Sequence, residues 1–473
     1  MKTASDLRHD SIRSLVIKLA IPSMVAQLVN VLYSIIDRMY IGNIPEVGDV
    51  ALAGAGVCGP IVTLLSSFGT LVGLGGSILM AMRLGEKKKE QAEQILSNSF
   101  LMLVIFSLLL TITFLLIKDD LLIQFGASEV TFPYANTYMT IYTLGTFFAL
   151  LSIGLNYFIT CQGFSFISMT TVLLGAVTNI ILDFVFIFVF HTGIAGAAWA
   201  TVIAQMLSCV FAVTFLFSKK VPIRITFGNY SFSIIRKILY IGLCPFIILA
   251  TDNLIIIIMN AVLQKYGGPA EGDLLISCAT IVQSYMMLIT GPMIGITGGT
   301  QTIISYNYGA ANSERVKQAE RLILALCFVF TSCMFVISRV FPVHFVHIFT
   351  REQTLVDLSV WGINTFTLAI IPLSFQYVFV DGLTALGRTK TALFLSIFRK
   401  TSFVVFTALL PAIFTAKHAF YAEPLSDLLS SCITSTAFLL IFSKHLKARE
   451  ISVNSLAKTC EPKALLKCKA LEE

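Results

Sequence analysis

Two aspartates lie deep inside long apolar stretches of the sequence. Asp37 occurs within NVLYSIIDRMYIG, and Asp183 occurs within TNIILDFVFIF. A carboxylate at the centre of a membrane span costs about 2.5–3.5 kcal/mol on insertion scales, so such a residue indicates function. Carboxylate oxygens suit a hard cation such as Na⁺. A carboxyl group buried in a low-dielectric cavity can instead hold a proton near neutral pH.

Further polar side chains are spaced so that they share helical faces in the same half of the chain. Residues four apart, or seven apart, lie one or two turns along one face of an α-helix. An amide stands four residues before one aspartate and another stands seven before the second, while a hydroxyl and an amide are four apart in a later stretch. The residues predicted to form a cation-coupling site are Asp37, Asn179, Asp183 and Thr201, and Asn30 and Gln205 are additional candidates for coupling or substrate binding.

A purely structural interpretation of the two aspartates is also open. Asp37 is followed directly by Arg38, with which it could pair near the outer surface. Asp183 could simply hydrogen-bond a neighbouring helix. The coupling interpretation is preferred because both carboxylates fall in one half of the chain.

The elements that must position these residues are membrane helices. Of the 473 residues, 56% are hydrophobic and only 12% are charged, whereas soluble proteins carry about 25% charge. A span needs about 20 mostly apolar residues. Twelve runs reach that length, near 14–41, 52–82, 93–117, 134–160, 166–190, 195–218, 235–262, 274–305, 320–340, 356–385, 391–414 and 425–443.

The net charge of +7 reflects topology and does not indicate nucleic-acid binding. Most of the Lys and Arg residues fall in the N-terminal segment, in every second connection and in the C-terminal tail. Because cytoplasmic loops are enriched in Lys and Arg, both termini are predicted to be cytoplasmic. The expected location is the plasma membrane, with lipid as the surrounding partner and no nucleic acid.

The two halves of the chain repeat one another. Pro22 and Pro245 are 223 residues apart, and so are the double glycines that begin at Gly75 and Gly298. Six spans in each half give the halves the same orientation, so the predicted fold class is an all-α membrane protein of two six-helix lobes, related by a pseudo-two-fold axis along the membrane normal. The predicted segments are 1–13 (cytoplasmic), 14–218 (N-lobe), 219–234 (linker), 235–443 (C-lobe) and 444–473 (cytoplasmic tail).

The second half does not repeat the acidic residues of the first. At the repeat offsets Asp37 falls on Asn260, and Asp183 falls on Thr407. The second half has polar residues of its own. We expect Asp252 and Asn253 to contribute to coupling or substrate binding, and Asp381 and Asp427 to be solvated near span ends.

Enzyme chemistry and tightly bound cofactors are not indicated. No CxxC pair occurs, and most cysteines lie in or beside apolar stretches, where we expect free thiols. His344 and His347 are three apart but have no third ligand nearby. No Ser-His-Asp or Cys-His arrangement stands out, so we expect neither an enzyme nor a metal beyond a monovalent Na⁺.

Three stretches resemble the multidrug and toxic compound extrusion (MATE) family, in its prokaryotic form. They are IPSMVAQLVNVLYSIIDRMYIG (21–42), NIILDFVFIF with GIAGAAWATVIAQ (179–205) and GPMIGITGGTQTIISYNYGAANSERVKQA (291–319). YAEPLSD (421–427) and Arg399 also fit this resemblance, which extends from about residue 14 to 443.

The resemblance implies a V-shaped twelve-helix antiporter that exports cationic or amphipathic drugs in exchange for Na⁺ or H⁺. By position it assigns the first-lobe cation site to Asp37, Asn179, Asp183 and Thr201, with Asn156 a further match nearby. Arg38 departs from the small polar residue that many members have after the aspartate. We expect the protein to function as a monomer without a cofactor.

A flippase for lipid-linked precursors, from the same wider superfamily, is the alternative. Such a protein is expected to place several cations in its central cavity. Arg399 and Lys400 are the clear mid-span cations of this sequence, which favours the drug antiporter.

Overall fold

The computed structural model describes residues 6–469, with the side chains of 253, 254, 269, 270, 273 and 453–469 left outside the description. Long apolar runs form helices because a bilayer offers backbone groups no water to hydrogen-bond. No strand occurs in the described range. Eleven of its helices are long and apolar enough to cross a membrane, and a bent pair supplies a twelfth candidate span. The prediction of an all-α membrane protein is therefore confirmed.

The N-lobe is defined here as the elements from α1 to α7. It contains α1 (Ile12–Gly42), α2 (Gly48–Gly85), α3 (Lys89–Gln124), α4 (Phe132–Leu144), α5 (Thr146–Cys161), α6 (Ser165–Phe184), a π-helical turn (Val185–Val189) and α7 (Gly193–Phe217). The helices α4 and α5 meet at a bend of 56° and together make one candidate span.

The C-lobe is defined as the elements from α8 to α14. It contains α8 (Phe232–Gly309), α9 (Ser313–Val340), α10 (Pro342–Val346), α11 (Gln353–Phe366), α12 (Ile370–Ala385), α13 (Thr389–Ile413) and α14 (Ala422–Lys469), with 3₁₀ turns at Thr367–Ala369 and Ala416–Tyr421. Two candidate spans lie within α8, because Gly268 reverses the chain with a φ of 62° that favours glycine.

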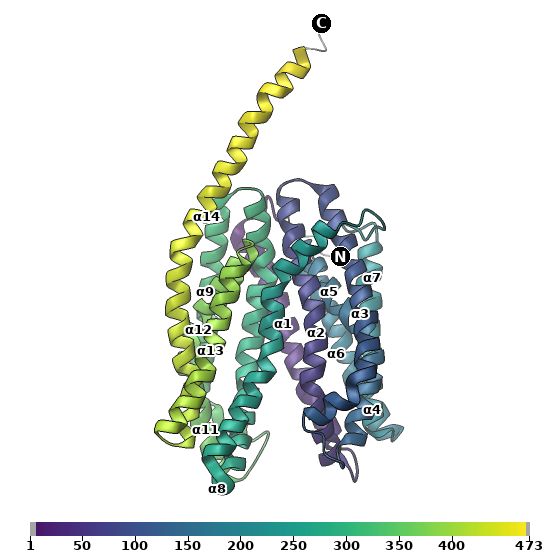
Figure 1. Ribbon diagram of the computed structural model, residues 1–473, viewed down its shortest axis with the longest axis vertical. Helices are drawn as coiled ribbons and strands as arrows, with labels where there is room; N and C mark the ends of the chain where they lie inside the picture. The colour runs from purple at the N-terminus through teal and green to yellow at the C-terminus, as the bar shows by residue number, and fades with distance from the viewer. Residues whose placement is uncertain (1–5, 470–473) are drawn as a thin grey trace.

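Figure 1 shows the two lobes side by side, with both ends of the chain at one end of the bundle. We call this the termini end and the opposite one the far end. The ribbons of the lobes separate toward the far end, and α14 projects well beyond the termini end. Large apolar side chains such as Leu116, Leu439 and Leu440 are more than 70% exposed, as expected for helix faces that contact lipid.

The lobes exchange helix ends at the termini end. The first part of α1, including Leu15 and Leu19, is buried in the apolar core of the C-lobe. Reciprocally, Ile238 and Ile241 of α8 are buried in the core of the N-lobe. This exchange is what a two-fold relation between the lobes produces, since a contact from i to j is then repeated from j to i.

Two equivalent glycines allow the lobes to approach each other closely. A Cβ on Gly85 would lie 2.0 Å from the carbonyl oxygen of Tyr306, and a Cβ on Gly309 would lie 2.1 Å from that of Met82. The two glycines are 224 residues apart in the sequence. Only glycine permits this backbone contact, so the termini end of the structure is closed by main chain against main chain.

Candidate cation site in the N-lobe

The core of the site is formed by α6. Asn179 and Asp183 lie one turn apart and are only 1% and 0% exposed. The π-helical turn Val185–Val189 follows directly. Turns of this kind are frequent at functional sites, because they change the direction of the side chains that follow them.

Asp37 of α1 faces Asp183 across the interface of the two helices. The carboxyl groups are close enough to share a hydrogen bond when one of them carries a proton. Asp37 Oδ1 and both oxygens of Asp183 are buried and receive no hydrogen bond from the described residues. Among the described residues no ion pair joins Asp37 to Arg38, and the Arg38 side chain is exposed. The structure therefore brings together the two aspartates that the sequence singled out.

The amide side chains around this pair use their N–H groups elsewhere. Asn179 Nδ2 donates to Thr201 Oγ1 at 3.2 Å, and Gln205 Nε2 donates to the Tyr142 hydroxyl at 3.5 Å. The oxygens Asn179 Oδ1 and Gln205 Oε1 are buried and have no partner among the described residues. The helices α1, α6 and α7 thus hold two carboxyls and two amide oxygens that lack donors among the described residues.

Such a set of oxygens has a clear chemical preference. Buried charges are very costly unless they are paired or bind a cation, and oxygen ligands without thiolate or imidazole suit hard cations. The described residues hold no group of three or more His, Cys, Asp or Glu that would suit a transition metal. The arrangement can accept a monovalent cation or a proton.

Tyrosines near the carboxyl pair were missed in the sequence analysis. Tyr33 lies near Asp37 and Asp183, and Tyr138 lies near Asp37. Tyr138 and Tyr142 stack with their ring centroids 6.3 Å apart. Tyr33 precedes Asp37 by four residues, so helical spacing offered a signal, whereas the tyrosines of α4 approach only through tertiary packing.

Other predicted residues are not joined to this pair by any described contact. Asn30 donates to Gln27 Oε1 at 3.5 Å, and Asn156 has a buried amide oxygen without a partner in the described residues. Asp252 forms an ion pair with Lys400 in the C-lobe. The side chain of Asn253 lies outside the described residues.

Each mid-span carboxylate of this C-lobe cluster is paired with a cation. Arg399 bonds Glu423 and Asp427 at 2.7 Å each. Asp427 is 0% exposed, so the expectation that it is solvated near a span end was wrong. The reason is that Arg399 reaches it from α13, a contact between helices that hydropathy alone does not reveal. Asp381 is half-buried rather than exposed, and Thr297 and Gln301 of α8 lie beside it.

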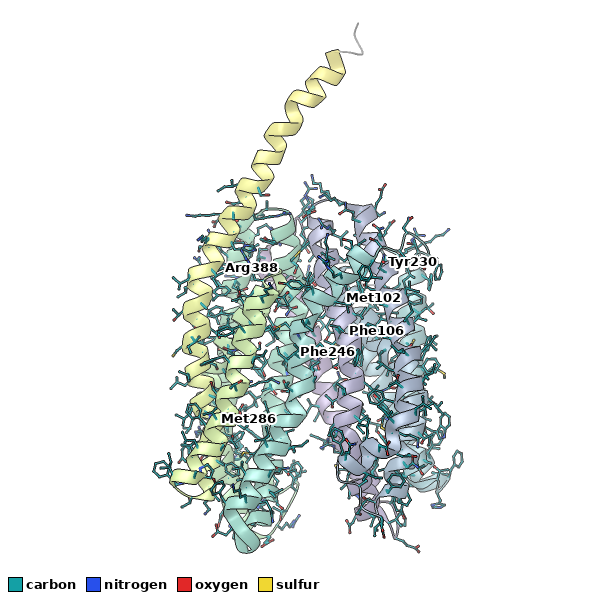
Figure 2. The ribbon with its side chains drawn as sticks, viewed as in Figure 1. Met102, Phe106, Tyr230, Phe246, Met286 and Arg388 are labelled. Atoms are coloured by element: carbon teal, nitrogen blue, oxygen red, sulfur yellow. The ribbon has the colours of Figure 1, made fainter. Side chains whose placement is uncertain are left out.

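Aromatic and charged side chains also link the lobes. Phe68 packs against Phe106 of its own lobe and against Phe246 of α8, with ring centroids 5.9 and 4.9 Å apart. Figure 2 labels Phe106 and Phe246. At the termini end, Arg449 of α14 donates to Glu86 at 2.5 Å and to the carbonyl of Gly309 at 3.2 Å. This ion pair crosses between the lobes.

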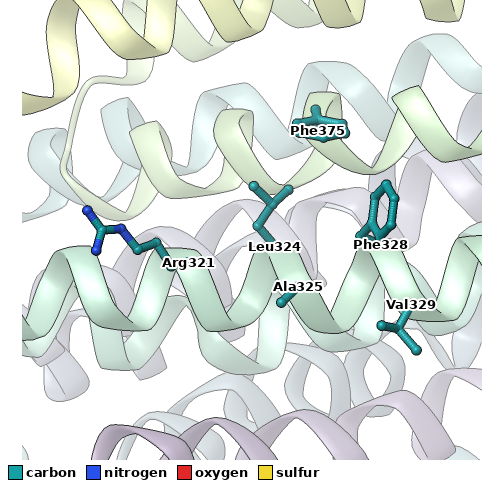
Figure 3. A pocket seen from close by; sticks show the side chains of 6 residues that line it. All are labelled: Arg321, Leu324, Ala325, Phe328, Val329 and Phe375. Carbon is teal, nitrogen blue, oxygen red and sulfur yellow. The ribbon is translucent and has the colours of Figure 1, made fainter.

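A surface pocket of about 310 Å³ lies elsewhere, between α9 and α12. It is lined by Arg321, Leu324, Ala325, Phe328, Val329 and Phe375 (Figure 3). Phe328 and Val329 are 44% and 58% exposed, which is typical of a lipid-facing surface. None of the predicted site residues lines it.

Comparison with known proteins fits this geometry. The MatE family profile matches the chain twice, at residues 22–185 and 246–410. The chain belongs to the MATE family. The two matched MATE segments begin 224 residues apart (246 minus 22), close to the offset of the sequence repeat. MATE proteins are transporters, so the chain is not an enzyme.

Individual MATE relatives are distant in sequence but cover nearly the whole chain. The Multidrug export protein MepA of Staphylococcus haemolyticus is 24% identical over 450 residues, covering 94% of this chain and 96% of its own. Its Staphylococcus aureus counterpart is 24% identical over 400 residues, covering 84% and 86%.

Solved MATE structures share the fold. An outward-facing multidrug resistance MATE transporter of the MOP superfamily has a TM-score of 0.88 at 21% identity, covering 94% of this chain and 100% of its own. A MOP superfamily transporter from Pyrococcus furiosus, described as having reversed polarity in its binding pocket, has a TM-score of 0.87 at 22% identity, covering 94% and 99%.

Proposed function

We propose that this MATE protein exports cationic or amphipathic small molecules across the plasma membrane in exchange for Na⁺ or H⁺, with both termini in the cytoplasm. The observation that carries the proposal is the Asp37–Asp183 pair, whose buried oxygens lack donors in the described residues. The names of the relatives, multidrug export proteins, support the substrate class.

The residues of this site suggest how coupling arises. With the site empty, Asp37 and Asp183 repel each other, and their charges are poorly solvated. A bound cation or proton removes that repulsion and draws α1 toward α6. Because α1 also packs into the core of the C-lobe, its position affects both lobes. If the ion binds more tightly to one arrangement of the lobes and the drug to another, inward movement of the ion is coupled to outward movement of the drug.

Dye efflux with separately imposed gradients tests the proposal. Proteoliposomes are loaded with a fluorescent organic cation, and a Na⁺ gradient and a pH gradient are applied in turn. Asp37→Asn and Asp183→Asn are expected to abolish efflux driven by the coupling ion. Asp120→Asn is the matched control, since Asp120 is an exposed carboxylate at the far end of α3. Normal efflux by both site variants would refute the proposal.

The lipid-linked flippase is less well supported by the charge distribution. Lys400 bonds Asp252, and Arg399 bonds Glu423 and Asp427. Neither mid-span cation is therefore free for a phosphate group. Binding assays with lipid-linked sugars against quaternary ammonium dyes separate the two functions.

A further inference from the structure

A second buried carboxylate without partners lies in the C-lobe. Glu320 of α9 is 4% exposed, and no described residue donates a hydrogen bond to either of its carboxylate oxygens. It packs against Gly382 of α12, where a Cβ would lie 2.5 Å from Glu320 Oε1. The glycine thus leaves the room that the carboxylate occupies.

Asp381 lies directly before that glycine and is near enough to Glu320 for their charges to interact. Thr297 and Gln301 of α8 lie beside Asp381. Gln301 is only 2% exposed, and its Oε1 also lacks a donor in the described residues. Three helices, α8, α9 and α12, therefore bring together two carboxyls, an amide oxygen and a hydroxyl.

No described cation neutralises these carboxyls. Neither Glu320 nor Asp381 takes part in an ion pair within the described range. The Arg315 side chain of α9 donates hydrogen bonds to Asn307 Oδ1 and to the carbonyls of Leu7 and Asp10. The other titratable groups close to the pair are neutral in character: Cys327, Cys244 and Tyr157.

We infer that Glu320, Asp381 and Gln301 form a second monovalent cation site, which binds Na⁺ or a proton independently of the N-lobe pair. Oxygen donors without a countercharge are the ligands that such a cation requires. Glu320 stands seven residues after the start of α9, and Asp381 stands four residues before the end of α12. At about 1.5 Å per residue, both lie within roughly 11 Å of the termini end.

The location distinguishes this site from the N-lobe site. Asp37 lies five residues before the end of α1, and Asp183 lies close to the end of its span, both toward the far end. The two sites therefore lie toward opposite ends of the bundle, and the C-lobe site is nearer to the side that holds the termini.

Cation binding to the purified full-length protein tests the inference. Binding of ²²Na⁺, and proton uptake in weakly buffered solution, are measured in an Asp37→Asn, Asp183→Asn background that lacks the N-lobe carboxylates. This background is expected to retain cation binding, and adding Glu320→Gln is expected to weaken it at least about tenfold. Glu93→Gln is the matched control, because Glu93 occupies the same QAE sequence in the N-lobe but pairs with Lys89 at 3.8 Å.

Each outcome decides the question. If the background variant binds ²²Na⁺ and adding Glu320→Gln removes that binding, the site is a Na⁺ site. If the background variant takes up protons and adding Glu320→Gln removes that uptake, the site is a proton site. Absence of both in the background, or their persistence in the Glu320→Gln variant, overturns the inference. If Glu320→Gln does not elute as a folded species, Asp381→Asn provides the same test. Dye efflux is not used, so failure here is distinct from failure of the proposed function.

Discussion

The two lobes repeat one backbone but use charge in opposite ways. In the N-lobe, Asp37 and Asp183 face each other without a cation in the described residues. In the C-lobe, Arg399 is bonded by Glu423 and Asp427 near mid-span. The glycines that close the termini end are equivalent in both lobes. The comparison teaches that a repeat preserves backbone packing while its mid-membrane polar residues diverge: the far-end carboxyls of the N-lobe lack a countercharge, whereas Glu423 and Asp427 of the C-lobe share Arg399.

The largest effect expected is the loss of the internal cation of the C-lobe. Arg399→Met leaves Glu423 and Asp427 buried and uncompensated, and breaking a buried pair from one side costs about 3–5 kcal/mol. We expect a marked fall in the thermal unfolding temperature of the purified protein. Arg38→Met, which changes an exposed arginine outside any described ion pair, is the control. An unchanged unfolding temperature for Arg399→Met would show that the C-lobe charges are not internally balanced.

The next effect tests the close glycine contacts that both lobes make at the termini end. Gly85→Ala and Gly309→Ala should each force the lobes apart at the termini end, because each new Cβ meets a carbonyl oxygen of the other lobe. Overpacking of this kind typically costs about 1–3 kcal/mol. The labelling rate of a cysteine introduced beside the interface of the two lobes should rise in both variants and by similar amounts. Gly56→Ala, with nothing within 4 Å of its Cβ position, should leave accessibility unchanged; a rise in only one glycine variant would contradict the two-fold exchange.

A smaller effect of opposite sign is expected in the N-lobe. Asp183→Asn removes a buried charge that has no donor in the described residues, so it should raise unfolding stability by about 1 kcal/mol in buffer free of Na⁺. The same variant should lose ion-driven efflux. Thermal unfolding measured beside dye efflux checks both parts, and a destabilised Asp183→Asn would indicate that the aspartate serves structure rather than coupling.

The smallest effect concerns the ion pair between the lobes. Burial would raise the pKa of Glu86, but hydrogen bonds from Lys88 and Arg83, together with Arg449, outweigh it and hold the pKa below its ordinary value of 4.5. A depressed carboxyl pKa gives stability that is complete above the ordinary value and is lost as the pH falls through the folded-state pKa. Unfolding stability from this pair should therefore stay constant between about pH 6 and 8.

Removal of the Arg449 charge isolates that contribution, because the bonds of Glu86 to Arg83 and Lys88 stay in place. Arg449→Gln should lower the unfolding free energy by about 0.5–1 kcal/mol, as expected for a pair that solvent partly screens. Glu86→Gln, which also loses the bonds to Arg83 and Lys88, should lower it at least as much. If Glu86→Gln changes stability only below pH 5, the pair does not join the lobes under ordinary conditions.

Much of the fold follows from patterns that the sequence displays directly. Hydropathy located every candidate span, because each helix satisfies its own backbone hydrogen bonds and needs only an apolar surface toward lipid. Spacing by four residues found Asn179 and Asp183, since both lie on one helix. The Gly and Pro landmarks showed the repeat because close backbone packing restricts which residues fit.

Contacts between helices set the limit of that approach. Asp427 was expected to be solvated because its partner, Arg399, lies on another helix. Glu320 stands at the first residue of an apolar run, where it resembles any solvated charge at a span end, and only the position of Gly382 shows that it is buried. Tyr142 of α4 contacts Gln205 of α7, again a contact between two helices.

The π-helical turn after Asp183 is the last turn of its span, and the chain then passes through a short loop into α7. Such a turn accommodates one residue more than the regular winding. Deleting a single residue from Val185–Val189 would let this last turn wind as a regular α-helix. Asn179 and Asp183, which precede the turn, would keep their orientation, whereas the aromatic side chains within the turn would face new neighbours. One of them is Phe188, whose ring centroid lies 5.7 Å from that of Tyr40 on α1. A single deletion would therefore change the aromatic contact between α1 and the end of this span and leave Asn179 and Asp183 in place.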